Sequence, residues 1–348
     1  MSPPRNLAAR ALLGLPAMAY GEAMRLRNRF YDGKGAVHRA GLPVLSVGNL
    51  TVGGTGKTPI VAWLVRTLRE CGLKPAVVSR GYGGTAGRGP LLVSRGDGPL
   101  AGARICGDEP YLLARHLEGA IVIVGSDRVE GTRAARRAGA DVAVLDDGFQ
   151  HRRLARDLDI VLLDAHNPFG NYSLLPAGTL REPLAGLARA GIVLITRSRP
   201  GESLVVIERV VRRHNPAVPI LRAGNWRVGF RDLAGDPVEK PRRALAFCGI
   251  GNPASFAADL EAEGVEVVAL RIFADHYPYT EADAAALSRL ALDRDATLVT
   301  TEKDLVRFPA HPGPGPGPAI AALRIEARIH DRDEMLRRIR AAIEGAAP

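Results

Sequence analysis

The sequence predicts an α/β protein in which a doubly wound, mostly parallel sheet is followed by a second, smaller α/β/α lobe. Short apolar runs rich in β-branched residues alternate with segments that have the apolar spacing of helices, which is typical of βαβ units. The 348 residues exceed what one ordinary hydrophobic core holds, so two lobes are expected. A glycine-rich loop follows the first apolar run, at the strand end where doubly wound sheets bind ligands.

That glycine-rich loop has the order of elements found in a phosphate-binding loop (P-loop). Pro43–Val47 is a short β-branched run, Gly48–Gly56 contains four glycines, and Ile60–Leu68 has the apolar spacing of a helix. In a P-loop, backbone amides and the helix N-terminus surround phosphate oxygens, Lys57 reaches the β/γ bridge, and the Thr58 hydroxyl holds Mg²⁺. The sequence therefore predicts a nucleoside triphosphate site formed by Thr51, Val52, Gly53, Gly54, Thr55, Gly56, Lys57 and Thr58.

Thr51 departs from the strict pattern G-x-x-x-x-G-K-[ST], which requires glycine at this position. Gly53 and Gly54 can supply the tight turn instead, as in GG-x-GK variants of the loop. The alternative interpretation is a glycine-rich strand-to-helix turn in which Lys57 is incidental. The strand before the loop and the helix after it favour the P-loop.

The charge balance of the chain is basic, because 47 Lys and Arg residues outnumber 37 Asp and Glu residues, for a formal net charge of +10. Such an excess suits nucleic acid, an anionic membrane surface or an anionic substrate, although an arginine-rich solvated surface accounts for it equally well. Aromatic residues make up only 5% of the chain and form no stacking array. We therefore expect no nucleic-acid partner.

The three cysteines, Cys71, Cys106 and Cys248, are far apart in the sequence and form no C-x-x-C motif. This spacing argues against a disulfide framework or a zinc site and fits a reducing cytoplasm. The sequence has no uninterrupted run of 18 or more apolar residues, so no transmembrane helix is expected.

Residues 1–42 form a basic amphipathic segment ahead of the first strand. The apolar residues Leu7, Leu12, Leu13, Leu15, Met18, Met24, Leu26 and Phe30 alternate with Arg5, Arg10, Arg25, Arg27, Arg29 and Lys34. Such a segment can lie in a membrane interface, with arginines towards lipid phosphates. Two alternatives remain. The run Ala11–Tyr20 resembles a signal peptide, although nucleotide binding argues against export, and the segment can also be a helix that packs on the first lobe.

Residues 43–220 are expected to form the first lobe. Its strands are predicted at Pro43–Val47, Pro75–Ser79, Ile121–Gly125, Asp141–Leu145, Ile160–Asp164 and Ile192–Thr196, with helices at Ile60–Leu68, from Gly107 to His116 and at Arg128–Ala138. The carboxyl ends of parallel strands meet at one edge of a sheet. We therefore expect residues 51–58, Arg80, Asp146 and Asp147 to lie near one another.

Residues 221–240 are expected to be a β hinge, since Leu221–Val238 has strand-like alternation and no long helix, and a connection running both ways between the lobes fits this pattern. Residues 241–348 are expected to form the second lobe. Its strands are predicted at Arg243–Gly249, Val265–Ile272, Thr297–Thr301 and Ile320–Ile329, followed by a basic helix at Glu334–Glu344. Residues 311–318 alternate Pro and Gly, which predicts a stiff surface loop.

The apolar run Val142–Leu145 ends in Asp146 and Asp147, as the metal-binding strand of a P-loop enzyme does. Carboxylate oxygens are ligands that Mg²⁺ prefers, and two adjacent carboxylates repel each other unless a cation lies between them. The alternative interpretation is an aspartate that caps a helix or a turn. The pair favours bound Mg²⁺.

Further polar motifs, taken together in their order, identify a family. The segments SVGNLTVGGTGKTP, RGYG, GDEP, DDGFQH, PAGTLREP, FCGIGNP, FADHYPYT and TTEKD resemble those of the tetraacyldisaccharide 4′-kinases of lipid A biosynthesis. The similarity extends from about residue 10 to the last helix, and DDGFQH, LREP and DHY are its most specific motifs.

This resemblance implies a kinase that uses ATP and Mg²⁺ to phosphorylate the 4′-hydroxyl of a tetraacyldisaccharide 1-phosphate. It also implies two α/β/α lobes joined by a β hinge, an active site in the cleft, and a peripheral position at the cytoplasmic face of the bacterial inner membrane. A monomer is expected.

The resemblance also implies roles for individual residues. Asp108 of GDEP pairs with His276 of DHY to activate the sugar hydroxyl. Thr58, Glu109, Asp146 and Asp147 are expected to hold the metal, and Glu182 is expected around the metal and phosphates. Residues of the same motifs are expected to contact the substrate or to support this group: Arg80, Gln150, His151, Arg181, Glu182 and Asp275.

General chemistry supports this assignment, because phosphoryl transfer needs positioning and charge neutralisation more than covalent chemistry. Lys57 and Mg²⁺ would offset phosphate charge, Asp108 would accept the hydroxyl proton, and His276 would orient or relay it. Two other functions remain open at the sequence level. A membrane-associated P-loop regulatory ATPase would have no use for His276 or Glu182, and a soluble small-molecule kinase would have none for the amphipathic start.

Overall fold

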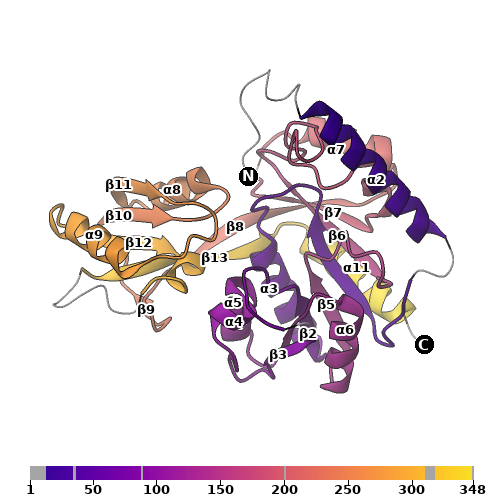
Figure 1. The fold of residues 1–348 in the computed structure, drawn as a ribbon, viewed down its shortest axis with the longest axis horizontal. Coiled ribbons are helices and arrows are strands. Elements are labelled where there is room, and N and C mark those ends of the chain that lie inside the picture. Colours follow the sequence, from indigo (N-terminus) through magenta and orange to yellow (C-terminus); the bar gives the residue numbers. More distant parts are fainter. Residues whose placement is uncertain (1–12, 34–36, 88, 200, 310–317, 347–348) are drawn as a thin grey trace.

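The computed structural model describes residues 13–33, 37–87, 89–199, 201–309 and 318–346, which form two lobes joined by a pair of long strands (Figure 1). Its strands form one 13-stranded sheet in the order β11-β10-β12-β13-β8-β7-β6-β1-β5-β2-β4-β3, with β9 paired to β8. Parts of two predicted segments lie outside the described residues. These are the N-terminal residues Arg5, Leu7, Arg10 and Leu12 with Lys34, and positions 311–317 of the Pro/Gly loop.

The first lobe has the predicted doubly wound architecture. Its strands are β1 (Val44–Asn49), β2 (Pro75–Ser79), β3 (Leu91–Ser94), β4 (Ile121–Val124), β5 (Val142–Asp146), β6 (Leu158–Asp164) and β7 (Ile192–Thr196). All pair in parallel except the edge strand β3, which the sequence did not predict because its four residues stand among glycines and prolines. The parallel strands are buried along their whole length, as expected for a sheet covered on both faces.

Helices cover both faces of this sheet. They are α2 (Gly14–Asp32), α3 (Lys57–Glu70), α4 (Ala103–Cys106), α5 (Asp108–His116), α6 (Arg128–Arg137), the 3₁₀ helix η1 (Leu184–Arg189) and α7 (Val205–His214). Val77 packs in the core beneath α3 and α5, whereas its neighbour Val78 packs in the core beneath α6. Successive residues of a strand point to opposite faces, so one short apolar run serves both cores.

The hinge consists of two strands that are distant in sequence. β8 (Ile220–Arg231) continues the first-lobe sheet beside β7 and then pairs antiparallel with β13 (Ile320–Ile329), from Ala223↔Ile329 to Arg231↔Ala322. The sequence analysis placed both strands that connect the lobes within residues 221–240. This is wrong, because only β8 and the short β9 (Pro237–Val238) lie there, and the second connecting strand is β13. A strand's own alternation does not identify its partner, and here the partner follows about ninety residues later.

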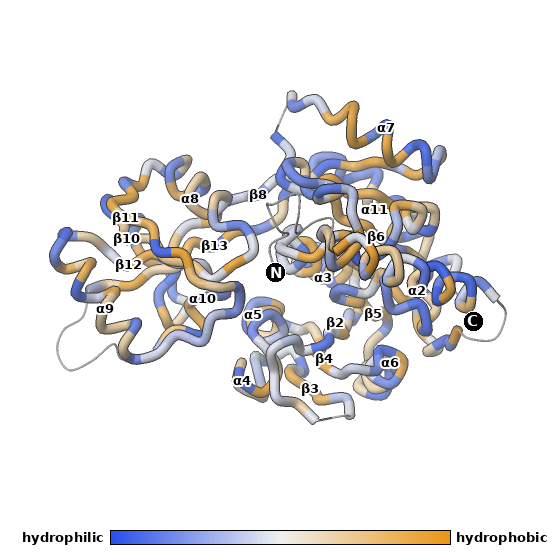
Figure 2. Tube along the Cα trace, turned by 45° about the horizontal axis from the view of Figure 1, so that its top comes forward, coloured by the Kyte–Doolittle hydropathy of each residue, from blue (hydrophilic) through white to orange (hydrophobic). Residues whose placement is uncertain are grey.

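The second lobe repeats the α/β plan on a smaller scale. β10 (Arg243–Cys248), β11 (Glu266–Ile272) and β12 (Thr297–Thr301) pair in parallel, with α8 (Pro253–Ala262), α9 (Glu281–Leu292) and α10 (Glu302–Leu305) around them. Figure 2 shows apolar segments inside this lobe and hydrophilic segments on its outer turns. Phe247 of β10 belongs to the core on one face of the sheet, and its neighbour Cys248 to the core on the other.

The last helix, α11 (Arg332–Gly345), returns to the first lobe (Figure 1). Met335 and Ile339 are buried in the core that also contains Leu64 of α3. The predicted boundary, which gave residues 241–348 to the second lobe, is therefore wrong for this helix. Apolar spacing identifies the buried face of a helix but does not identify the core that receives it.

Because Met335 is fully buried in the first lobe, we expect Met335→Ala to lower the free energy of unfolding by about 2–5 kcal/mol. Urea unfolding followed by circular dichroism measures this loss. Leu292→Ala, at an exposed position of the second lobe, is the control and is expected to change stability little. Equal stability of both variants would contradict the packing of α11.

Candidate active site

The phosphate loop connects β1 to α3 with its turns at glycines. Gly53 and Gly56 have φ angles of 112° and 78°, which residues with a Cβ rarely adopt. Thr51 is buried and forms an isolated antiparallel bridge with Leu180, and the Val52 amide donates to the Thr179 carbonyl at 2.8 Å. Position 51 is thus in extended backbone, which explains why it does not require glycine.

Lys57 is the first residue of α3, and its ammonium lies among oxygen atoms. Lys57 Nζ is 3.3 Å from Asn49 Oδ1 and 3.7 Å from Asp147 Oδ1. The first amides of a helix have no partner within the helix, and they carry partial positive charge. The loop, the helix N-terminus and the lysine together make a site for an anion of phosphate type.

Asp146 and Asp147 differ in their electrostatic environment. Asp146 is buried, its Oδ2 accepts a hydrogen bond from Ser79 Oγ at 2.9 Å, and burial together with the negative charges of Glu109 and Asp147 raises its pKa to about 6. Burial also acts to raise the pKa of Asp147, but Lys57 and Arg181 outweigh it and lower that pKa. Asp147 is therefore a stable carboxylate, whereas at Asp146 burial and the two neighbouring carboxylates outweigh the opposing effects of Lys57 and Ser79.

The residues predicted to hold Mg²⁺ fit that ion. Asp146 Oδ1 is buried without a hydrogen-bond partner among the described residues, and Glu109 stands close enough to act on its pKa. The described part of the chain contains no group of three or more His, Cys, Asp or Glu side chains that could hold a metal by itself. Mg²⁺ at phosphate sites uses one or two carboxylates with phosphate and water oxygens, so the unpaired Oδ1 of Asp146 with one neighbouring carboxylate would be enough.

Asp108 and His276, far apart in sequence, face each other across the two lobes. Asp108 begins α5 in the first lobe, and His276 follows β11 in the second with a φ of 60°. His276 Nδ1 lies 3.2 Å from Asp108 Oδ2, and the Tyr82 ring lies 5.2 Å from the His276 ring. The structure thus brings together the pair that the family motifs indicated, beside the carboxylates of β5.

Two basic residues of this cluster were missed by the sequence analysis. Lys303 Nζ contacts Glu109 Oε1 at 3.3 Å and His276 Nε2 at 3.1 Å, and Arg307 Nη1 donates to Asp108 Oδ2 at 3.0 Å. Lys303 stands in the TTEKD motif at the end of β12, and Arg307 follows four positions later. Basic side chains four positions apart lie on one face of a helical turn, but this spacing does not indicate that the face meets Asp108 and Glu109 in the other lobe.

Glu182 supports the site from behind and does not reach the phosphate loop itself. It is fully buried, and its carboxylate accepts from Gln150 Nε2 at 2.9 Å and from Arg189 Nη2 at 2.7 Å. Gln150 Nε2 also donates to the Asn49 carbonyl at 2.9 Å, while Arg181 Nη1 holds Asp147 at 2.7 Å. Gln150 therefore links Glu182 to Asn49 at the end of β1, and the neighbouring Arg181 holds Asp147.

The three remaining predicted residues lie in different positions. Asp275 Oδ1 is 3.8 Å from Lys303 Nζ at the lobe boundary, whereas Arg80 is exposed at the end of β2. His151 is largely inside the first lobe, where burial and the positive charge of Arg128 lower its pKa to about 4. We therefore assign His151 to the support of the site.

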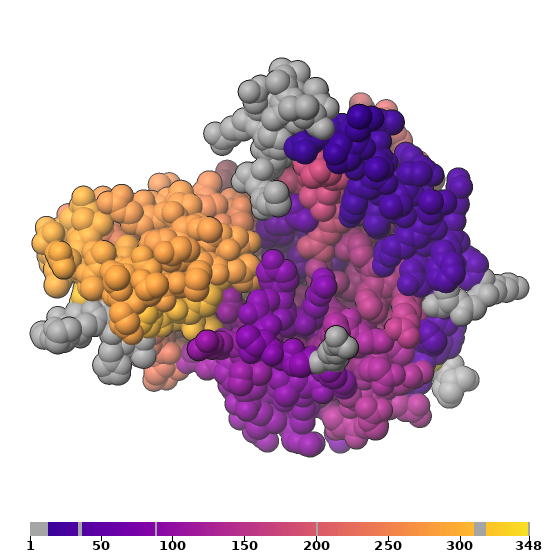
Figure 3. Space-filling view, viewed as in Figure 1, coloured from indigo at the N-terminus to yellow at the C-terminus, as the bar shows by residue number. Residues whose placement is uncertain are grey.

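The two lobes lie against each other in the space-filling view of Figure 3, and the second lobe also approaches the phosphate loop. A Cβ added to Gly251 would lie 3.0 Å from the Gly54 amide nitrogen. Here Gly251 permits the close approach of the second lobe to the loop that is expected to bind phosphate.

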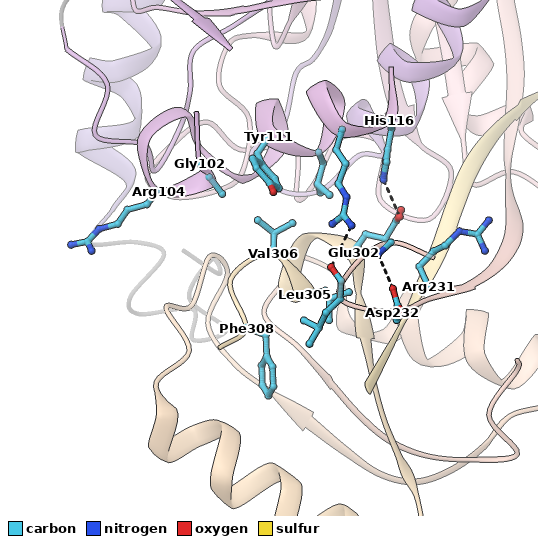
Figure 4. Close-up of a pocket in the computed structure, with 15 residues that line it drawn as sticks. Gly102, Arg104, Tyr111, His116, Arg231, Asp232, Glu302, Leu305, Val306 and Phe308 are labelled. Carbon is cyan, nitrogen blue, oxygen red and sulfur yellow. Dashed lines mark hydrogen bonds and ion pairs between the residues drawn. The ribbon is translucent and has the colours of Figure 1, made fainter. Parts of the chain in front are cut away.

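A cavity of ≈ 380 Å³ lies elsewhere between the lobes, on the other side of α5 and α10 (Figure 4). His116 Nε2 and Glu302 Oε1 meet at 3.2 Å in its wall, and Arg115 Nη2 donates to the Leu233 carbonyl at 3.3 Å. None of the predicted site residues lines this cavity. The expected chemistry therefore belongs to the polar cluster around Asp108 and Lys57.

The loop, the lysine at the start of α3 and the carboxylates after β5 define the class of P-loop enzymes that act on nucleoside triphosphates. A family model described as tetraacyldisaccharide-1-P 4'-kinase matches residues 9–344, and the chain belongs to that family.

Relatives and a solved structure agree with this family. Tetraacyldisaccharide 4'-kinases from Syntrophus aciditrophicus (strain SB) and Chlorobium phaeobacteroides (strain DSM 266) are 43% and 40% identical to the chain. These matches cover 91% and 85% of this chain and 89% and 86% of the relatives. The crystal structure of LpxK from Aquifex aeolicus in complex with ATP has a TM-score of 0.77 and 29% identity, and it covers 96% of this chain and 99% of that one.

The lowered pKa of His151 predicts a pH dependence of stability. Between pH 7 and pH 4 the unfolded ring, with a pKa near 6.5, takes up a proton that the folded ring resists, so acidification lowers the free energy of unfolding. We expect this fall to be about 1–3 kcal/mol larger in the wild type than in His151→Gln, the lower figure allowing for solvent screening. Urea unfolding at pH 7, 5.5 and 4 measures it. Parallel curves for the two proteins would show that His151 is not held neutral.

Proposed function

We infer that this chain is an ATP-dependent kinase that phosphorylates the 4′-hydroxyl of a tetraacyldisaccharide 1-phosphate and gives lipid IVA. The observation that carries the proposal is the Asp108–His276 contact, which pairs a carboxylate and an imidazole across the lobe boundary next to a phosphate loop. A regulatory ATPase needs the phosphate loop alone, whereas a kinase must also activate an acceptor hydroxyl. Membership of the kinase family supports the same conclusion.

In the proposed mechanism the chain supplies positioning and charge. The loop amides and Lys57 bind the triphosphate, and Asp147, held by Arg181, remains a carboxylate beside Lys57. Bound Mg²⁺ would neutralise phosphate charge next to Asp146. Asp108 accepts the proton of the sugar hydroxyl, His276 orients Asp108, and contact between the lobes at Gly251 excludes water that would otherwise hydrolyse ATP.

Helix α2 presents two different faces. One packs on the first lobe, where Tyr20 Oη donates to the Arg181 carbonyl at 2.6 Å and Gly21 is buried. On the other face, residues at helical spacing expose large apolar side chains to solvent: Leu15 at 78%, Met18 at 72%, Leu26 at 58% and Phe30 at 67%. The helix therefore packs on the lobe, as one sequence interpretation proposed, and its other face exposes these four apolar side chains.

That exposed apolar face supports a membrane contact. A soluble surface rarely gathers four large apolar side chains on one helix without a partner, and Arg25 and Arg29 stand beside them for anionic headgroups. The acceptor of the proposed reaction is itself a lipid, so the enzyme would take it from the membrane surface. No helix in the described ranges has the length and apolar character needed to cross a bilayer. We propose peripheral binding at the cytoplasmic face of the inner membrane.

The kinase proposal is tested by incubating the protein with labelled ATP, Mg²⁺ and a tetraacyldisaccharide 1-phosphate in mixed micelles. We expect Lys57→Ala to lower turnover by several orders of magnitude, because the cation next to the phosphates is lost. We expect Asp108→Asn to lower it about 10²–10⁴-fold, with little change in ATP binding. ATP hydrolysis without label transfer to the disaccharide would favour the regulatory ATPase.

The membrane proposal is tested by replacing Leu15, Met18, Leu26 and Phe30 with serine. Burial of one large apolar side chain is worth about 1.5–3 kcal/mol, so the loss of four should weaken vesicle binding at least tenfold, with the fold retained. Flotation with vesicles rich in anionic lipid measures binding. The control replaces Ile272 and Leu292, which are similarly exposed on the second lobe. If both variants float as the wild type does, α2 does not bind the membrane.

A further inference from the structure

Lys303 and Arg307 approach the proposed Asp108–His276 pair from the second lobe, and neither belongs to the residues expected to bind phosphate or metal. Resting on the proposed function, we propose that both are positioning residues for the kinase reaction. Lys303 fixes His276 in the tautomer protonated at Nδ1, and Arg307 fixes Asp108 so that only its Oδ1 remains to accept the hydroxyl proton.

The first part follows from the chemistry of the lysine. An ammonium group has three hydrogen-bond donors and no acceptor, so its 3.1 Å contact with His276 Nε2 requires an unprotonated nitrogen there. The neutral ring then carries its proton on Nδ1, which donates to Asp108 Oδ2 at 3.2 Å. With Nε2 engaged by Lys303, His276 orients the carboxylate and does not itself take the hydroxyl proton.

The lysine is itself held in place by two carboxylates on opposite sides of the lobe boundary. Its Nζ lies 3.3 Å from Glu109 Oε1 in the first lobe and 3.8 Å from Asp275 Oδ1 in the second. Glu109 and His276 accept hydrogen bonds from the ammonium group, whereas Asp275 attracts it through charge alone. The ammonium group that bonds His276 is thus held in part by Glu109 of the first lobe. The orientation and tautomer of His276 therefore depend on the two lobes being in contact.

The second part follows from the oxygen that Arg307 occupies. Arg307 Nη1 donates to Asp108 Oδ2 at 3.0 Å, the same oxygen that accepts from His276. Among the residues that the structure describes, none donates to Asp108 Oδ1. In the reaction the sugar oxygen bonds to the γ-phosphorus as the bond to ADP breaks, and the hydroxyl proton passes to that Oδ1. Two donors on Oδ2 hold the carboxylate for this transfer.

The guanidinium of Arg307 is held by a buried carboxylate. Asp304 is fully buried and pairs with Arg307, and it also accepts from Thr301 Oγ1 at 2.7 Å and from Tyr279 Oη at 3.1 Å. Arg307 Nη2 donates further to the Gly249 carbonyl at 3.2 Å. A planar guanidinium fixed at several points holds its remaining nitrogen in one direction, which suits it to orient Asp108.

The test is ring-nitrogen NMR of the whole chain labelled with ¹⁵N-histidine, with His276 assigned by comparison with His276→Gln. We expect a pyridine-type Nε2 and a protonated Nδ1 in the wild type, and a loss of this signature in Lys303→Met. Lys240→Met, which removes an exposed lysine of the second lobe, is the control and should leave the spectrum unchanged.

Kinetics complete the test. We expect Lys303→Met and Arg307→Met to lower kcat about 10–100-fold with less than a threefold change in the KM for ATP, and Arg307→Lys to recover part of the loss. A protonated Nε2 in the wild-type spectrum would overturn the proposal for Lys303. This measurement needs no variant, so the proposal can be tested even if Lys303→Met does not fold. A lower kcat with an unchanged tautomer would also overturn it, since Lys303 would then act only as an ion pair between lobes.

The NMR measurement needs no substrate, which separates this inference from the proposed function. If the wild type fails to phosphorylate the disaccharide while His276 keeps its Nδ1 proton, the proposed function fails and the assigned tautomer stands. For Arg307, an unchanged kcat in Arg307→Met overturns the proposal.

Discussion

The antiparallel pairing of β8 with β13 is the constraint on which the rest of the molecule depends. These two strands join the sheets of both lobes into one, and their hydrogen bonds fix how the second lobe stands against the first. The contact of Gly251 with the phosphate loop and the contact of His276 with Asp108 both follow from that placement. After β13 the chain returns to the first lobe, where α11 packs in the core. The chain thus leaves the first lobe through β8 and is anchored in it again by α11.

Charge compensation is the second organising feature. Asp108, Glu109, Asp146 and Asp147 lie close together near the boundary of the lobes, and isolated buried carboxylates are costly. Lys57 and Arg181 compensate Asp147, while Lys303 and Arg307 from the other lobe compensate Glu109 and Asp108. Asp146 is left with a raised pKa and an Oδ1 to which no described residue donates, and this is the observation that supports its proposed role as a metal ligand.

Much of the fold could be predicted from the sequence because its parallel strands are short, apolar and buried on both faces. The six predicted first-lobe strands are confirmed, and positive φ angles at Gly53 and Gly56 confirm the glycine turns of the phosphate loop. The edge strand β3 and the destination of α11 could not be predicted. A four-residue edge strand carries little apolar signal, and a helix's apolar face does not specify which of two cores will bury it.

The sequence by itself determined the local chemistry: a phosphate loop at Lys57, a carboxylate pair at Asp146 and Asp147, and the motifs that indicate Asp108 and His276. Only the tertiary structure decided that Lys303 and Arg307 complete this cluster, and that Glu182 supports Gln150 from behind. The physical reason is that the spacing of residues along the chain determines which side chains are neighbours within one helical turn or at the end of one strand. Contacts between lobes depend on strand pairing over a long sequence separation, and no local pattern encodes that pairing.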